Sequence, residues 1–231
     1  MKRYSVLLII TSFFLCFVFQ FAGAQTPTPS PEKKEKKEVL LEKADKIKYD
    51  SQNEQFVASG NVIAVQGKNR IQCQDLSFSL KDNQGTFTGG VAVARDKTTI
   101  RSTSMDGDFD QDRYTFDGEV ELKKERQEKE GTSTILWKAQ KLAYNGNTEE
   151  AQSEEGVEIT WKQTTIKAQK ASYFPKDEAR NQLERIELDG QVFITEKERE
   201  IEVNRAVYYL DTETLEAETI IRARFILGEK K

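Results

Sequence analysis

The sequence predicts an all-β protein built from a repeat of about 29 residues, and two observations lead to this fold class. The first is spacing, because a Gly-x-Val phrase returns at a fixed interval and places Val62, Val91 and Val120 29 residues apart. The second is alternation, because apolar and polar residues alternate in short runs, for example from Val157 to Trp161. Such runs, ended by Gly, Asn or Asp, are typical of half-buried strands joined by turns.

Residues 1–24 precede the repeat and have the layout of a secretory signal peptide. Lys2 and Arg3 open the segment, an apolar run follows, and Ala22 and Ala24 supply small residues before a cleavage site at Gln25. An uncleaved membrane anchor is the alternative, although the apolar run is short for a membrane span. We expect cleavage and therefore export.

Residues 25–43 are rich in Pro, Lys and Glu and cannot bury much apolar surface, so we interpret them as a flexible linker. The repeat domain then spans residues 44–231. Two stretches interrupt its period. The charged insert at residues 123–131 lengthens the interval from Val120 to Val157 to 37 residues, and the loop at residues 175–182 lengthens the interval from Val157 to Val192 to 35.

The apolar residues of each repeat change parity once. Ile71 and Cys73 fall on one parity of the strand, whereas Leu76 and Phe78 fall on the other. Because successive side chains of a strand point to opposite faces, both pairs can face one interior only if the strand bends between them. The pattern in each repeat therefore predicts a strand, a bend and a second strand. Repetition of this unit forms two sheets that face each other across a shared apolar interior.

The composition argues against most catalytic and metal-binding chemistry. The chain has no histidine, and after cleavage Cys73 is its only cysteine, so it lacks both the commonest general base and a pair of zinc-binding thiols. It also lacks a Gly-rich phosphate loop and a Gly-x-Ser-x-Gly elbow. The net charge of −4 argues against nucleic acid as a partner. We expect no enzyme activity, no cofactor and no bound metal.

Aromatic residues recur at one repeat position, and this position defines the candidate binding interior. They are Tyr49, Phe78, Tyr144, Tyr173 and Tyr208, whereas the third repeat has Gly107 there and Phe109 two residues later. If the two sheets stay apart, their inner faces line an apolar groove that suits lipid. If the sheets close, the same residues form a core layer. The candidate lipid-binding residues are Ile47, Tyr49, Val62, Leu76, Phe78, Val91, Val120, Leu142, Tyr144, Val157, Ile159, Tyr173, Val192 and Tyr208.

Three phrases resemble the LptA/OstA family of periplasmic lipopolysaccharide-transport proteins: ADKIKYD from residue 44, FVASGNVIAVQGKNRIQCQDLSF from residue 56 and WKAQKLAYNG from residue 137. The resemblance covers roughly Ala44 to the C-terminus. It implies a β-jellyroll of V-shaped, stacked antiparallel strands around an apolar interior groove. It also implies a periplasmic bridge that carries lipopolysaccharide, acyl chains inward, from the inner to the outer membrane. The implied partners are lipopolysaccharide and same-fold transport proteins of the inner- and outer-membrane complexes, reached through edge strands.

Two other hypotheses stand beside the bridge. One is an inner-membrane-anchored scaffold of the same fold that resembles LptC, and the other is a cargo-free secreted β-solenoid. Retention of residues 1–24 in the mature protein would favour the scaffold, and a fully packed interior would favour the solenoid.

The two ends of the repeat predict how the protein associates. The first strand, expected at residues 44–50, and the last, expected at residues 220–227, read as ordinary strands without a cap. An open edge accepts an incoming strand, so we predict head-to-tail pairing with a second copy or with a same-fold partner. The alternative is that Arg222 and Arg224 keep the last edge single.

Overall fold

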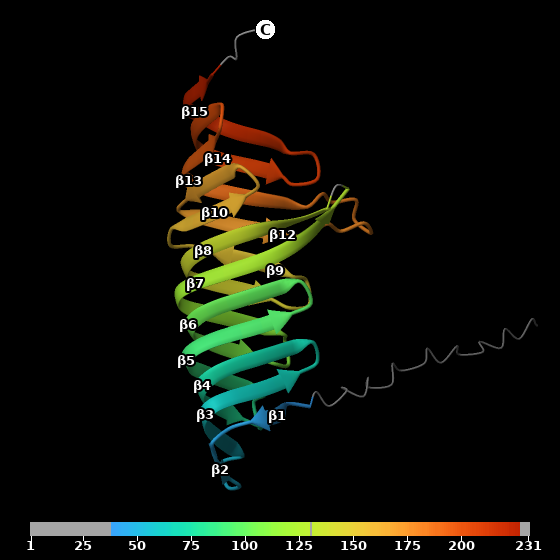
Figure 1. The fold of residues 1–231 in the computed structure, drawn as a ribbon, viewed down its shortest axis with the longest axis vertical. Coiled ribbons are helices and arrows are strands. Elements are labelled where there is room, and N and C mark those ends of the chain that lie inside the picture. Colours follow the sequence, from blue (N-terminus) through green and yellow to red (C-terminus); the bar gives the residue numbers. More distant parts are fainter. Residues whose placement is uncertain (1–37, 130, 227–231) are drawn as a thin grey trace, which may run out of the picture. The chain divides into compact units, whose positions relative to one another are not determined.

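The computed structural model describes residues 38–129 and 131–226, and the predicted signal peptide lies outside them. The described residues form one sheet of 15 strands whose pairings are antiparallel. Figure 1 shows the strands stacked from β1 and β2 at one end to β15 at the other. The predicted all-β fold is confirmed.

Most strands of the stack are long, and the short strands lie at its first end and between residues 150 and 174. At the first end, β1 (Leu40–Lys43) and β2 (Lys46–Asp50) both pair with β3 (Gln55–Gln66). The long hairpins that follow contain β4 (Asn69–Ser79), β5 (Gln84–Arg95), β6 (Thr98–Asp108), β7 (Arg113–Glu128) and β8 (Gly131–Asn145). Four short strands follow: β9 (Glu150–Ser153), β10 (Val157–Trp161), β11 (Thr164–Ala168) and β12 (Lys170–Phe174). The stack ends with β13 (Arg185–Glu196), β14 (Arg199–Tyr209) and β15 (Thr214–Phe225).

Each long strand bends near its middle, and in β3, β5, β7 and β13 a glycine with positive φ lies at the bend. In β5, φ is +80° at Gly89 and +83° at Gly90, a region that residues with a Cβ rarely adopt. A Cβ at Gly89 would lie 2.4 Å from the Cβ of Gln74 on β4, so glycine also permits the close approach of the two strands. The β4–β5 register breaks here, between Gln72 and Asp75, which is where the parity change predicts a bend. Equivalent breaks occur in the β3–β4, β5–β6, β6–β7, β7–β8, β13–β14 and β14–β15 pairs.

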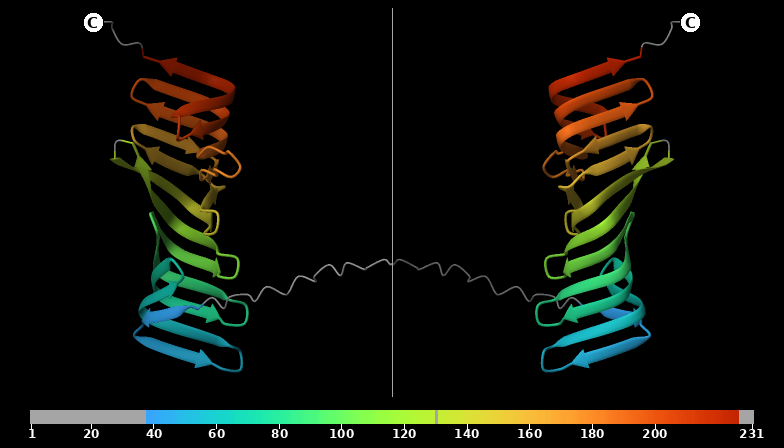
Figure 2. Two further views of the ribbon diagram at one scale, coloured as in Figure 1. Left: turned by 90° about the vertical axis from the view of Figure 1, so that its right-hand side faces the viewer. Right: turned by 90° about the vertical axis from the view of Figure 1, so that its left-hand side faces the viewer.

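The bends divide the unit into two arms that face each other like the arms of a V. We call the side with the bends the spine and the side with the hairpin turns the mouth; Figure 1 shows the mouth on the right, and Figure 2 shows both sides face on. Arm A ends in the turns at residues 67–68, 96–97, 162–163 and 197–198 and in the β7–β8 hairpin. Arm B ends in the turns at residues 51–54, 80–83, 109–112, 146–149 and 210–213 and in the loop between β12 and β13.

Apolar side chains fill the space between the arms. Buried residues from every strand between β3 and β14 join one continuous cluster. Its largest fully buried members include Trp137, Phe78, Phe87, Phe109 and Phe116. The interior that the sequence predicts as a groove is thus packed with side chains in this structure.

The start of the ordered sheet differs from the prediction. β1 begins at Leu40, inside the segment that the sequence assigns to the linker, residues 25–43. Leu41 pairs with Ala64 of β3 and packs against the apolar cluster, which gives this short stretch a place in the fold that its charged surroundings conceal. Among residues 38–129 and 131–226 no helix is long and apolar enough to cross a membrane.

Candidate functional site

The interior between the arms is the candidate site, and most of the predicted site residues lie in it. Twelve of the fourteen are buried, with at most 6% of their surface exposed, and they share the single apolar cluster. They are Val62, Leu76, Phe78, Val91, Val120, Leu142, Tyr144, Val157, Ile159, Tyr173, Val192 and Tyr208. The repeat register therefore places these side chains correctly, whereas lipid binding by them stays a prediction.

The structure places Ile47 and Tyr49 differently from the other twelve residues. Their side chains are 62% and 58% exposed, so they do not line an enclosed interior. Both lie on β2, which pairs only with β3 and forms the first edge of the stack within the described residues. The alternation identifies the correct face of β2, but among the residues that the structure describes no strand pairs with its other side to continue the core.

Tyrosines form the layer of the interior that lies next to the mouth. Tyr114 donates a hydrogen bond from its hydroxyl to Asp112, and Tyr173 donates one to Glu184, each at 2.7 Å. Burial, and then these carboxylates, raise the pKa of both hydroxyls above the ordinary value. Burial also raises the pKa of Tyr144 to about 12. Tyr114 and Tyr173 keep an apolar ring in the interior and a hydroxyl on the carboxylates of the mouth, an arrangement suited to a boundary between apolar and aqueous surroundings.

Ion pairs close the mouth, and sequence reasoning missed them. Arg95 pairs with Asp112 at 3.0 Å, Lys124 with Glu149 at 2.5 Å, and Lys162 with Glu213 at 2.6 Å. Arg126 pairs with Glu184 and with Asp211. In each pair the cation lies on arm A and the carboxylate on arm B, so these pairs link the two arms across the mouth.

The sequence predicts a charged insert at residues 123–131. Its described residues, 123–129 and 131, form the outer part of the β7–β8 hairpin. The hairpin extends past the last β8–β10 pair, which joins Ile135 and Trp161. The guanidinium of Arg126 lies 5.7 Å from the centre of the Trp161 ring, and the Trp161 indole donates a hydrogen bond to Ser133 at 3.0 Å. The insert therefore brings a charged side chain over an aromatic part of the interior.

The electrostatics of Arg126 follow from this position. Burial alone would lower its pKa, but Glu184, Asp211 and Glu128 act in the opposite direction and hold the pKa above the ordinary value. The guanidinium is therefore charged at every accessible pH, and it satisfies two carboxylates of arm B. The sequence signal for this role is weak, since a run of Lys and Glu normally marks a solvated surface.

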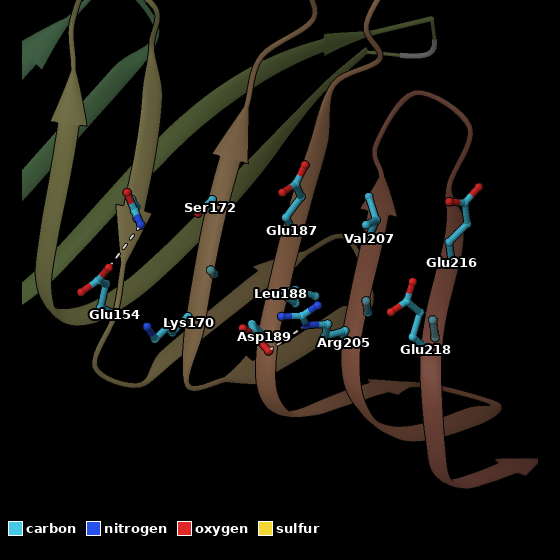
Figure 3. A pocket seen from close by; sticks show the side chains of 14 residues that line it. Glu154, Lys170, Ser172, Glu187, Leu188, Asp189, Arg205, Val207, Glu216 and Glu218 are labelled. Atoms are coloured by element: carbon cyan, nitrogen blue, oxygen red, sulfur yellow. Dashed lines mark hydrogen bonds and ion pairs between the residues drawn. The ribbon is translucent and has the colours of Figure 1, made fainter.

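A hollow of about 530 Å³ lies elsewhere, on the outer face of β9 and β12–β15 (Figure 3). Across neighbouring strands Lys170, Asp189, Arg205 and Glu218 stand opposite one another, so the charges alternate in sign. Arg205 reaches Asp189 at 3.4 Å. Figure 3 shows charged side chains over most of this surface, which is unsuited to acyl chains. Among the described residues, no cluster of His, Cys, Asp and Glu has the arrangement of a metal site.

Comparison with known proteins identifies the family. Among solved structures, the chain is similar to LptH of Pseudomonas aeruginosa, described as the LptA-homologous periplasmic component of the lipopolysaccharide transport device; the identity is 15% and the TM-score 0.40, over 47% of this chain and 76% of that one. No curated protein matches the chain. The family model for lipopolysaccharide-assembly, LptC-related proteins matches residues 5–179. Because that match covers well over half of the sequence, the chain belongs to the LptC-related lipopolysaccharide-assembly family.

Proposed function

We propose that this protein carries lipopolysaccharide across the periplasm, with the acyl chains between its two arms. The observation that carries the proposal is the continuity of the apolar interior, which runs through the strands from β3 to β14 and reaches both ends of the stack. At one end Ile47 and Tyr49 are exposed, and at the other Ile220 and Phe225 are 64% and 60% exposed. An apolar path that is open at both ends suits a carrier that passes lipid along a row of similar proteins.

The layered mouth supports the same function. An acyl chain would replace side-chain packing in the interior, while the phosphorylated sugar headgroup would remain among the polar groups of the rims. The tyrosine layer lies between these two environments. Because the interior is packed in this structure, the arms must part when cargo enters.

The form of the carrier is part of the proposal. The carrier has two alternative forms. One is a free periplasmic bridge, and the other is a scaffold anchored in the inner membrane. The family match begins at residue 5 and includes the apolar run of the N-terminal segment, which supports the anchored form. Sequencing the N-terminus of the native protein decides between them: Gln25 would establish cleavage and the free form, and Met1 in the membrane fraction would establish the anchor.

The cargo-free β-solenoid is the rival function, and the packed interior favours it. Membership of a lipopolysaccharide-assembly family weighs against it. A photo-crosslinking amino acid at Ile159, which is fully buried, tests for cargo, and the same group at the neighbouring Thr160, on the other face of β10, is the matched control. We expect lipopolysaccharide to crosslink at position 159 and not at 160. No crosslink at either position, together with no co-purified lipid by mass spectrometry, would establish the solenoid.

The partners follow from the edges of the sheet. No other strand pairs with the outer side of β15 within residues 38–129 and 131–226. An unpaired edge of this kind presents backbone donors and acceptors to an incoming strand. We propose that same-fold proteins, or a second copy, pair there.

A further inference from the structure

We propose that Arg126, Glu184 and Asp211 form a latch that holds the arms together over the C-terminal half of the mouth and must open before cargo enters. This inference rests on the proposed function, because it assigns the entry step of the same interior. It concerns a gate rather than the cargo, so the two can be tested separately.

The first argument is that the two departures from the repeat meet at the latch. Arg126 belongs to the charged insert at residues 123–131, and Glu184 is the last residue of the loop between β12 and β13, two positions after the stretch at residues 175–182. The two residues are 58 positions apart, and Arg126 and Asp211 are 85 apart. The chain leaves its regular period twice; the first added segment supplies Arg126, and the second ends close to Glu184, one of its two partners on the opposite arm.

The second argument is the placement of the cluster over the interior. The Arg126 side chain is only 13% exposed, and that of Glu184 only 10%. Glu184 also accepts the hydroxyl hydrogen of Tyr173, and Lys124 lies 5.4 Å from the centre of the Tyr173 ring. The latch therefore connects directly to the tyrosine layer, so an object that enters between the tyrosines must displace these contacts.

The charges around Arg126 argue for a contact that holds the two arms together and against a binding site for a free anion. Arg126 also contacts Glu128 at 3.3 Å, and Lys162 bridges Glu128 and Glu213. With Lys124 and its partner Glu149 added, three cations face five carboxylates, Glu128, Glu149, Glu184, Asp211 and Glu213. The net charge is negative, so a free phosphate gains nothing there while the carboxylates are in place.

The third argument concerns the energy of opening. When both partners of an ion pair separate into water, hydration of the freed charges offsets much of their attraction, so opening costs less than the contacts suggest. Removal of one partner by mutation instead leaves the other charge without its counter-charge in the closed state. Parting the arms at the spine would instead break the backbone hydrogen bonds of bent strands. A charged seam at the mouth thus gives the arms one side along which they separate at low cost, whereas an apolar seam would expose hydrophobic surface on opening.

The test uses the full chain with Arg126→Met, which keeps much of the apolar stem and removes the charge. Arg205→Met is the matched control, since Arg205 also pairs with a carboxylate but lies on the outer face. Hydrogen–deuterium exchange of residues 123–136 reports on the latch without any ligand. The uptake rate of a pyrene-labelled fatty acid, measured by stopped flow, reports on entry.

We expect Arg126→Met to speed both exchange of the hairpin and uptake of the probe, by roughly tenfold, the order that loss of a charged hydrogen bond predicts. Arg126→Lys should lie between the variant and the wild type, and Arg205→Met should match the wild type. Unchanged exchange and unchanged uptake in Arg126→Met would overturn the latch. Faster exchange with equal uptake in all proteins would overturn its gating role while leaving the carrier function intact. Absence of uptake in every protein would instead overturn the carrier function, and the gate with it.

Discussion

Arg95 and Asp112 form an ion pair of 3.0 Å across the mouth, although only 15% and 9% of their side chains are exposed. Asp112 also accepts a hydrogen bond from Tyr114 at 2.7 Å, and Asn69 donates to the same hydroxyl at 2.7 Å. This cluster joins the β3–β4, β5–β6 and β6–β7 hairpins through Asn69, Arg95 and Asp112. It closes the N-terminal half of the mouth as Arg126 closes the other half.

Asp112→Asn should therefore destabilise the protein. The residue has φ of +54°, which Asn tolerates, so the change removes the charge and leaves the backbone conformation available. The Arg95 guanidinium would then lack its carboxylate, which should cost about 1–3 kcal/mol in urea denaturation. The control is Asp96→Asn, because Asp96 also has a positive φ of 47° but pairs with the exposed Lys68. We expect less than about 1 kcal/mol there, and equal losses in both variants would contradict the role of burial.

Phe78→Ala tests the packed interior. Phe78 is 1% exposed, and its ring lies 5.3 Å from the rings of both Phe56 and Phe109. Removal of this ring should cost on the order of 3–5 kcal/mol. The control is Phe193→Ala on the outer face, where the side chain is 42% exposed and the loss should be within about 1 kcal/mol. A small loss at Phe78 accompanied by weaker lipid binding would show that the interior opens to a groove in solution.

The sequence reveals the arms and the interior because both depend on local patterns. The parity change between Cys73 and Leu76 locates a bend without knowledge of any distant residue. The third repeat shows where this reasoning stops. Gly107 holds the aromatic position there, and a Cβ on it would lie 2.8 Å from the Phe109 ring, so Phe109 fills the space that the missing side chain leaves. Gly85 likewise faces the rings of Phe78 and Phe87.

The mouth could not be predicted in the same way. Arg126 stands in a run of Lys and Glu that reads as solvated surface, and its partners are 58 and 85 residues away. Two turns meet across the mouth only if the right number of strands separates them and their hairpins extend far enough. The periodic pattern of the sequence predicts neither the pairing of turns nor the length of each hairpin. The exposure of the Ile47 and Tyr49 side chains could not be predicted, because a strand has the same alternation of apolar and polar residues inside a stack and at its edge.

Gly89→Ala and Gly90→Ala separate two reasons for glycine at a bend. Both residues have positive φ, so each substitution should lower the free energy of unfolding by about 1–2 kcal/mol through backbone strain. A Cβ at position 89 would also overlap Gln74, whereas one at position 90 meets no atom within 4 Å. We therefore expect the larger drop in melting temperature for Gly89→Ala. Equal drops would show that neighbouring strands at the spine shift easily, which would contradict a tightly packed bend.

The hydrogen-bond pattern of β15 allows a directed test of edge pairing. The backbone N–H of Ile226 donates to the carbonyl of Glu198 at 2.8 Å, and Phe225 stands opposite Arg199. Because N–H groups of an antiparallel strand alternate in direction, the N–H of Arg224 points to β14 and that of Ala223 points to the free edge.

Ala223→Pro should therefore weaken association and leave the monomer folded, because proline removes a donor from the free edge only. Arg224→Pro is the contrasting change: it removes a donor to β14, so it should lower the melting temperature, while loss of its exposed ion pair with Glu200 contributes little. Sedimentation velocity over a concentration series, alone and with same-fold partners, measures association, and a thermal scan of each variant measures folding. If the wild type stays monomeric at high concentration and binds no same-fold partner, β15 is a single edge. In that case Arg222 and Arg224 act as the charges that protect the edge from pairing.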